Sequence, residues 1–269
     1  RQSLDLAGSL YREIDDQKGH GTRNRFDPEQ NPLRLSNYSE PEIKDVKELS
    51  ARYQRALMGG RLRLNGFIRD DREEKDITQD IIFPAPESTA TLEQDKSRIL
   101  ELDLNFERPL GPGQKIEILG LHRNTNADGR EQSTEEGSTD ISTEAAQATE
   151  TILRGVFRQD FGALTVEGGL EAAWNRLDST ATLEEGGLVV DLPAASVRVS
   201  EDRLEAFASA VFQLAPNISL DTGLRYETSA LDQSGDSDTR RRFNFLKPRA
   251  LLRWQPFADH ELRLYTERE

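Results

Sequence analysis

Apolar and polar residues alternate along many short segments of this chain. In 163–175 the clearest set, Leu164, Val166, Leu170 and Trp174, lies on one parity, and no charged residue falls on that parity. A period of two predicts a strand with one apolar and one polar face. At about 3.3 Å per residue an eleven-residue strand is roughly 36 Å long, and it crosses about 25 Å when tilted by about 45°.

The alternation recurs along the whole chain, at 99–107 and 218–228 and, in weaker form, at 3–11, 61–69, 203–213 and 261–267. We therefore expect about eleven strands. Two segments, 41–57 and 199–213, also fit helical spacing with plausible caps. The repeated strand–turn–strand unit favours strands there, whereas helices at both places would make the fold α+β.

The connections alternate in length. Short turns rich in Gly, Pro, Asn and Asp are expected at 57–60, 110–113, 159–162, 214–217 and 255–259. Long polar loops are expected between them, at roughly 13–44, 71–96, 124–147, 176–201 and 230–241. A soluble domain seldom has so many long loops. Short turns on one rim and long loops on the other are typical of outer-membrane barrels.

Aromatic residues on the apolar parity fall at two heights. Four of them lie within about five residues of the short turns and two lie about ten residues beyond: Phe106, Phe157, Phe212 and Trp254, then Trp174 and Tyr226. This spacing predicts two aromatic girdles at the membrane interfaces. Ordinary cross-strand aromatic packing in a soluble sheet is the alternative.

The opposite parity carries charges of both signs. The residues expected on this face are Arg61, Arg63, Glu101, Asp103, Glu167, Glu171, Arg225, Glu227, Arg253 and Arg263, together with Arg69, Asp221 and Glu267. In a barrel they would face a lumen filled by water or a plug. In a soluble sandwich the same charges would meet bulk water.

Composition excludes several other classes of protein. The 269 residues include 35 Lys and Arg, 49 Asp and Glu, 3 His and no Cys, with a formal net charge of −14. Such an acidic chain repels nucleic-acid phosphates, and it offers neither disulfides nor a thiolate zinc site. The chain begins without Met and without an apolar leader, so we expect it to be a part of something longer.

Motifs for nucleotide, metalloprotease or serine hydrolase chemistry are absent. The segment 124–135 resembles a calcium loop except for Asn124 at its first position and Glu131, and Asp232, Asp236 and Asp238 form a second acidic cluster. Exposed polar turns account for both. We assign no catalytic, cofactor-binding or metal-binding residue and expect no cofactor.

One hairpin carries a family resemblance. Residues 203–212 turn through 214–217 into Ile218-Ser-Leu-Asp-Thr-Gly-Leu-Arg-Tyr-Glu227, and 245–256 with 262–268 continue the pattern. This stretch of about 70 residues resembles the barrel of TonB-dependent outer-membrane receptors. The resemblance implies a 22-stranded barrel around an N-terminal plug, importing a scarce nutrient with energy from the inner membrane. No plug or energy-coupling box is recognisable here.

We therefore expect an all-β, antiparallel up-and-down transmembrane barrel segment, half of a 22-stranded barrel, spanning 1–269. As such it would be a non-enzymatic part of a Gram-negative outer-membrane receptor for a siderophore, metal complex or carbohydrate. Its expected partners are outer-membrane lipid, the plug and the rest of the barrel, an inner-membrane energy-coupling protein and a small-molecule ligand. The alternatives are a soluble secreted all-β binding module and a glycan-active enzyme with paired carboxylates.

Overall fold

The computed structural model describes residues 2–15, 19–193, 195–235 and 238–268, and these form one antiparallel sheet without a helix. Within that part of the chain, no helix is long and apolar enough to cross a membrane. The strands are β1 (Gln2–Asp15), β2 (His20–Phe26), β3 (Pro32–Ser39), β4 (Glu42–Leu57), β5 (Gly60–Phe83), β6 (Glu87–Gly111), β7 (Gln114–Glu135), β8 (Ser138–Asp160), β9 (Leu164–Glu185), β10 (Leu188–Val190), β11 (Ser196–Ala215), β12 (Ile218–Gly235), β13 (Thr239–Phe257) and β14 (His260–Glu267).

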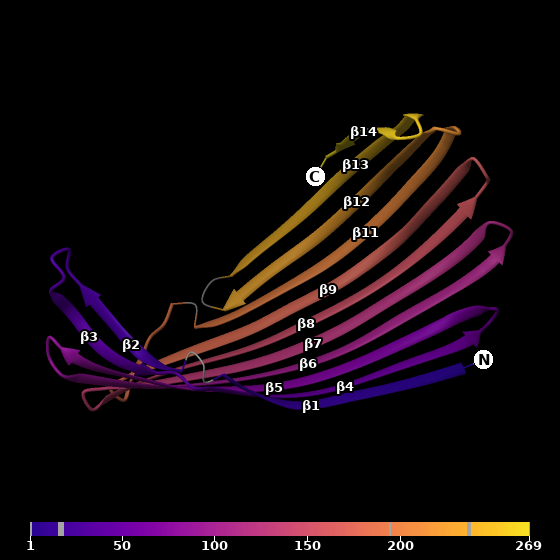
Figure 1. Ribbon diagram of the computed structural model, residues 1–269. Coiled ribbons are helices and arrows are strands. Elements are labelled where there is room, and N and C mark those ends of the chain that lie inside the picture. Colours follow the sequence, from indigo (N-terminus) through magenta and orange to yellow (C-terminus); the bar gives the residue numbers. More distant parts are fainter. Residues whose placement is uncertain (1, 16–18, 194, 236–237, 269) are drawn as a thin grey trace.

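Eleven of these strands form a continuous path, β1-β4-β5-β6-β7-β8-β9-β11-β12-β13-β14, and each pairs with its neighbour antiparallel. The short strand β10 pairs with β9, while β2 and β3 form a hairpin attached to β5. Figure 1 shows the long strands side by side, with the turns of β4–β5, β6–β7 and β8–β9 at one end. We call this end the short-turn rim and the opposite end the far rim. The all-β, up-and-down prediction is confirmed.

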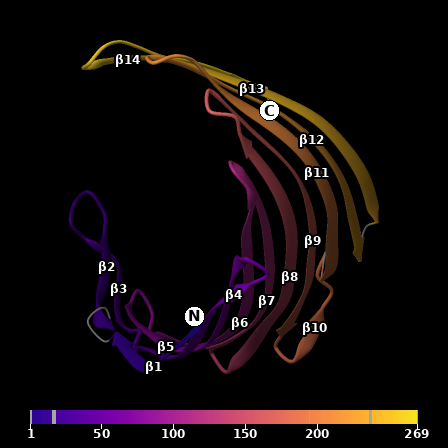
Figure 2. The same cartoon turned by 90° about the vertical axis from the view of Figure 1, so that its right-hand side faces the viewer.

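The sheet is curved and unclosed. Its outer strands β1 and β14 each have one neighbour on the path, and Figure 2 shows an open arc with these strands near its two ends. Side chains are crowded on the inside of such an arc and spread apart on the outside. In each strand, the side chains of one parity are therefore crowded and those of the other parity are spread apart.

Burial assigns the parities to the two faces. Leu10 and Leu264 are 79% and 71% exposed, although both are large hydrophobic residues. The most buried hydrophobic residues, Val46 and Ala173, lie on the charged parity at 1% exposure, where Glu205 is only 4% exposed. The charged parity therefore forms the concave face and the apolar parity the convex face, the reverse of a soluble protein.

The apolar band of the convex face crosses the hydrogen-bonded rows obliquely. Phe106, close to the short-turn rim, belongs to a row of paired residues that continues through Ile118, Gly155, Leu170 and Ala206 to Tyr226. Tyr226 lies farther from its own turn than Phe106 does. Strands are displaced in this way when they tilt around a barrel axis.

The structure corrects the prediction of long polar loops. Most of 71–96, 124–147 and 176–201 continues the strands, 13–44 contains the β2–β3 hairpin, and 230–241 lies largely in β12 and β13. β7 and β8 meet in a two-residue turn whose Glu136 and Gly137 have φ of 47° and 82°, as tight hairpins require. Beyond the apolar band a strand needs no apolar parity, so alternation disappears while backbone pairing continues.

The two segments with ambiguous spacing are strands. β4 covers the first one and β11 covers the second. Both pair along their length with neighbours on each side. Since an interior strand satisfies its backbone groups across the ladder, tertiary pairing overrides the helical propensity.

Candidate functional site on the concave face

Oppositely charged residues are paired across neighbouring strands of the concave face. Near the short-turn rim, Glu107 of β6 accepts from Arg63 of β5 at 3.0 Å and contacts Lys115 of β7 at 2.9 Å. Farther along the sheet, Arg69 of β5 contacts Glu48 of β4 at 3.0 Å. These contacts join side chains that hairpin geometry places opposite or diagonal to one another.

Three glutamates form a row at the centre of this face. Glu171, Glu205 and Glu227 lie directly opposite one another on β9, β11 and β12. Like charges so placed repel one another, and each carboxylate has a cation beside it. Arg203 contacts Glu171 at 3.0 Å and Arg225 contacts Glu205 at 3.1 Å. Arg154 and Lys247 add contacts to Glu171 and Glu227 at 3.5 and 3.0 Å.

An aromatic ring is packed within this charged row. Phe207 lies on the concave parity of β11, directly opposite Gly169 of β9. A Cβ atom at Gly169 would lie 2.6 Å from Phe207 Cζ, so the ring occupies the space that a side chain would fill. The guanidinium of Arg154 lies over the ring at 4.6 Å from its centroid, a cation–π arrangement.

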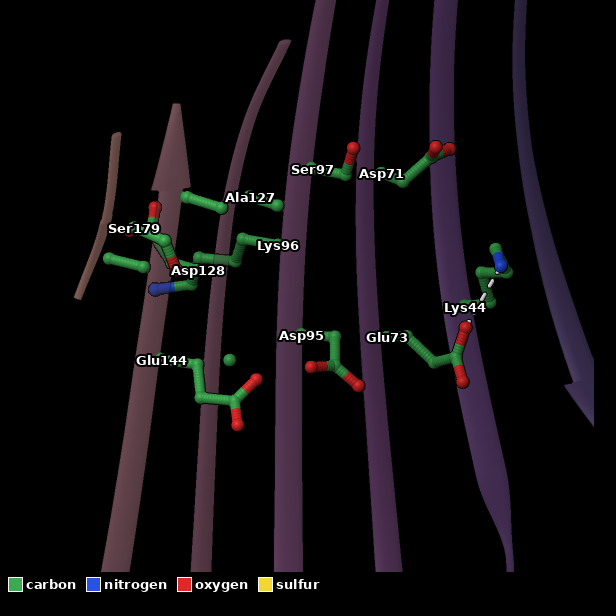
Figure 3. A pocket seen from close by; sticks show the side chains of 13 residues that line it. Lys44, Asp71, Glu73, Asp95, Lys96, Ser97, Ala127, Asp128, Glu144 and Ser179 are labelled. Carbon is green, nitrogen blue, oxygen red and sulfur yellow. Dashed lines mark hydrogen bonds and ion pairs between the residues drawn. The ribbon is translucent and has the colours of Figure 1, made fainter. Parts of the chain in front are cut away.

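Toward the far rim the concave face has an acidic hollow of about 290 Å³. Figure 3 shows Asp95 and Glu144 beside one another, with Glu73 and Lys44 across the hollow. Gly129 separates Asp95 from Glu144 in the ladder. Beyond the apolar band, Lys44 Nζ donates to Glu73 at 2.8 Å, and this bond holds the pKa of Glu73 below its ordinary value. Lys44 therefore places a paired positive charge at one side of the hollow.

A second hollow, of about 460 Å³, has an apolar floor. Its lining includes Ala148, Leu177, Val199 and Leu231, with Arg123, Glu150, Asn175 and Glu201 around them. Leu177 is 41% exposed although it lies on the concave parity. Asn175 Oδ1 is buried and has no hydrogen-bond partner among the described residues. The hollow can receive an apolar group.

The register places all ten sequence-predicted charged residues on the concave face. Those with an ion pair within 4.0 Å among the described residues are Arg63, Glu101, Glu171, Arg225, Glu227 and Arg263, and the remaining four are Arg61, Asp103, Glu167 and Arg253. The six predicted girdle residues, Phe106, Phe157, Phe212, Trp254, Trp174 and Tyr226, lie on the convex face.

Sequence reasoning missed important members of the concave face. Glu205 and Arg203 belong to the segment 199–213, which also fits helical spacing. In the helical alternative Phe207 lies on the apolar face of the helix, so its position on the concave face of a strand is not apparent. Arg154 lies in β8, where Gly155 and Thr151 interrupt the apolar parity. The identity of cross-strand partners requires the register, which a single strand does not encode.

The first of the two candidate cation sites is not a loop. The segment 124–135 lies within β7, where successive residues point to opposite faces and cannot wrap around one ion. Asp232 is in β12 and contacts Arg240 at 3.2 Å, while Asp236 lies outside the described residues. Over the part of the chain that the structure describes, no three His, Cys, Asp or Glu side chains are arranged to hold a metal ion.

Comparison with known proteins agrees with this architecture. The family model "TonB dependent receptor-like, beta-barrel" matches residues 11–267, so the chain belongs to the family of TonB-dependent receptor barrels. Members of this family are transport receptors, not enzymes, of the Gram-negative outer membrane. No curated protein matches the chain.

Solved structures share the fold at low sequence identity. The ferric-catecholate import receptor Fiu from E. coli K12 superposes with a TM-score of 0.57 and 10% identity, over 99% of this chain and 49% of that one. The ferric preacinetobactin receptor BauA from Acinetobacter baumannii gives 0.53 and 9%, over 96% and 45%. The copper transporter OprC gives 0.52 and 9%, over 99% and 44%. The chain thus spans about half the length of these receptors.

Proposed function

We propose that residues 1–269 form part of the wall of an outer-membrane uptake receptor. The convex face contacts lipid, and the concave face lines a lumen that holds a plug and the path of the ligand. The inverted burial carries this proposal, because lipid around the sheet would stabilise exposed leucines on one face together with a buried, ion-paired Glu205 on the other.

The six convex aromatics fit this placement. Phe106, Phe157, Phe212 and Trp254 lie near the short-turn rim, and Trp174 and Tyr226 lie toward the other edge of the apolar band. Trp174 and Trp254 are 48% and 43% exposed, so their rings can reach the two headgroup regions as girdles do.

The concave charges fit a water-filled or plug-filled lumen. Arg61, Asp103, Glu167 and Arg253 are the predicted lumen residues that have no ion pair within 4.0 Å among the described residues, and they are the groups available to a plug surface. The other partners proposed for this segment are the rest of the barrel and an inner-membrane energy-coupling protein.

The ligand is proposed to be a scarce nutrient such as a siderophore, a metal complex or a carbohydrate. Fiu and BauA are receptors for iron-bearing compounds by name, and OprC is a copper transporter. The apolar hollow supports a ligand-contact role near the far rim, since Leu177 and Val199 form an apolar floor within the charged face.

Depth-dependent fluorescence quenching tests the placement in the membrane. The receptor containing this segment is reconstituted in vesicles whose lipids carry bromine at defined depths. The difference between wild type and Trp174→Phe, and between wild type and Trp254→Phe, isolates the signal of each indole. We expect both indoles to be quenched by shallow bromines, from opposite leaflets.

One result of this experiment would contradict the proposal. Indoles that brominated lipid does not quench, in protein that shows β-sheet circular dichroism without detergent, would make the convex face an interface with another protein layer. The lipid-facing role would then be abandoned.

A further inference from the structure

Beyond the apolar band, the convex face carries charged instead of apolar residues on β1, β4, β5 and β6. These four strands lie side by side (Figure 1). Leu10, Leu49, Ile68 and Leu100 end the band on these strands. The next convex positions carry five cations, Arg12, Lys47, Arg72, Lys96 and Arg98, which we call the convex cationic patch, and two carboxylates, Asp45 and Asp70.

The carboxylates of the patch are outnumbered. Arg12 donates to both oxygens of Asp45, at 2.7 and 2.8 Å, and Arg98 contacts Asp70 at 2.6 Å. Lys47 lies directly opposite Asp70, and Arg72 lies directly opposite Asp45. Both cations are exposed, and neither has an ion pair within 4.0 Å among the described residues. Positive charge is left over in a chain whose formal net charge is −14.

One side of the patch places like charges together. Arg72 of β5 lies directly opposite Lys96 of β6, a position where like charges are unfavourable. Asp128 of β7 faces Lys96 from the other side, which leaves an excess of two positive charges over β1 to β7. At comparable distance beyond the band, the neighbouring convex positions of β7 and β8, Asn126 and Gln147, are uncharged. The excess is therefore local.

We propose that the convex cationic patch binds phosphate groups of phosphorylated lipid headgroups in the leaflet next to the far rim. The proposal rests on the membrane placement proposed above, since only then does the patch lie at headgroup level. Charge complementarity and continuity with the lipid-facing band identify the partner. Exposed guanidinium groups bind phosphate through paired N–H donors, and an anion between Arg72 and Lys96 removes their repulsion.

The test compares two matched double variants of the receptor that contains this segment. Lys47→Gln/Arg72→Gln removes two patch cations while the ion pairs of Arg12 and Arg98 stay intact. Arg25→Gln/Arg34→Gln removes two exposed cations from the β2–β3 hairpin, which also have no ion pair within 4.0 Å among the described residues. Native mass spectrometry of protein in neutral detergent counts bound diphosphoryl lipid A, monophosphoryl lipid A and phosphatidylcholine.

We expect the patch variant to bind diphosphoryl lipid A roughly tenfold more weakly than wild type. The hairpin variant should bind as wild type does, and affinity should fall with each phosphate removed from the lipid. Equal affinity of the patch variant and wild type, or an equal loss in the hairpin variant, would overturn the proposal.

The quenching experiment separates this inference from the proposed function. Indoles quenched in vesicles together with unchanged lipid A affinity in the patch variant would leave the membrane placement standing and overturn the phosphate site alone. Indoles that lipid does not quench would overturn both.

Discussion

The two faces of this sheet are built by the same strands and follow opposite rules. On the convex face, Leu102 and Leu170 are 51% and 60% exposed, and among the described residues only Val46 and Ala173 are buried hydrophobic residues. On the concave face, Glu171 and Glu205 are largely buried, and arginines from neighbouring strands contact them. Adjacent residues therefore meet different surroundings, so the effect of a substitution depends on parity more than on residue type.

The largest expected effect comes from charging the apolar band. Leu104 lies on the convex face between Leu64 and Gly120, whereas the next residue, Asn105, lies on the concave face and donates to Glu117. In the lipid-embedded receptor, Leu104→Lys should lower the free energy of unfolding by about 2–4 kcal/mol, as for lysine near the bilayer midplane.

Asn105→Lys is the matched control, because its ammonium can replace the amide beside Glu117 and should cost less than about 1 kcal/mol. Denaturant titration in vesicles measures both variants. Equal losses at the two positions would mean that the faces do not differ in polarity of surroundings.

The second prediction compares packing on the two faces. A Cβ at Gly169 on the concave face would lie 2.6 Å from Phe207 and 2.4 Å from the carbonyl oxygen of Gly155, whereas a Cβ at Gly155 on the convex face meets nothing within 4 Å. Gly169→Ala should therefore destabilise by about 1–3 kcal/mol through overpacking, and Gly155→Ala should be nearly neutral. The same titration decides, and a neutral Gly169→Ala would show that the ring moves aside freely.

The third prediction compares ion pairs. Glu205 is buried beside Arg225 at 3.1 Å, whereas Arg98 and Asp70 form a more exposed pair at 2.6 Å. We expect a coupling energy of about 1 kcal/mol for Glu205 and Arg225, reduced because Arg225 itself is about half exposed. The exposed pair should give about 0–0.5 kcal/mol despite its shorter distance.

Double-mutant cycles with Gln and Asn replacements measure both coupling energies. A larger coupling for the exposed pair would show that distance, rather than burial on the concave face, governs the strength of these contacts.

How much of this was predictable from sequence depends on where, in the proposed placement, lipid contacts the chain. Within the apolar band, alternation such as Leu100, Leu102 and Leu104 predicts strands and their faces, because the proposed contact with lipid requires apolar side chains at every second position. Outside the band nothing enforces alternation, and the strand extensions around Thr89 and Thr143 were expected to be loops.

The concave site was predictable in composition but not in pairing. Glu171 and Glu227 were expected to share a face, yet their neighbours Glu205, Arg203 and Arg154 emerge only from the register. That register depends on the turns and on the oblique displacement of strands, which no single segment encodes. Leu177 and Val199 form an apolar floor within a polar face, and this exception lies where alternation gives no signal.

The smallest expected effect lies beyond the membrane, where the distinction between the faces no longer depends on lipid. At the far rim the Glu135 carboxyl shares a hydrogen bond with Glu87, and this contact raises its pKa above the ordinary glutamate value of 4.5. The folded rim thus retains a proton that the unfolded chain releases at lower pH. Its stabilising contribution is present below pH 4.5 and is lost as pH rises through the raised pKa.

Hydrogen exchange at the far-rim ends of β6 and β7 in the receptor, corrected for the intrinsic pH dependence of exchange, measures this effect. Protection of residues 87–91 and 131–135 should fall as pH rises from 4 to 7, while the β4–β5 segments within the apolar band stay unchanged. Glu135→Gln should remove the dependence because an amide cannot lose the shared proton. Two results would contradict this prediction: protection that rises with pH, or a Glu135→Gln variant that keeps the pH dependence. Either one would mean that a group other than the Glu135–Glu87 contact titrates at the far rim.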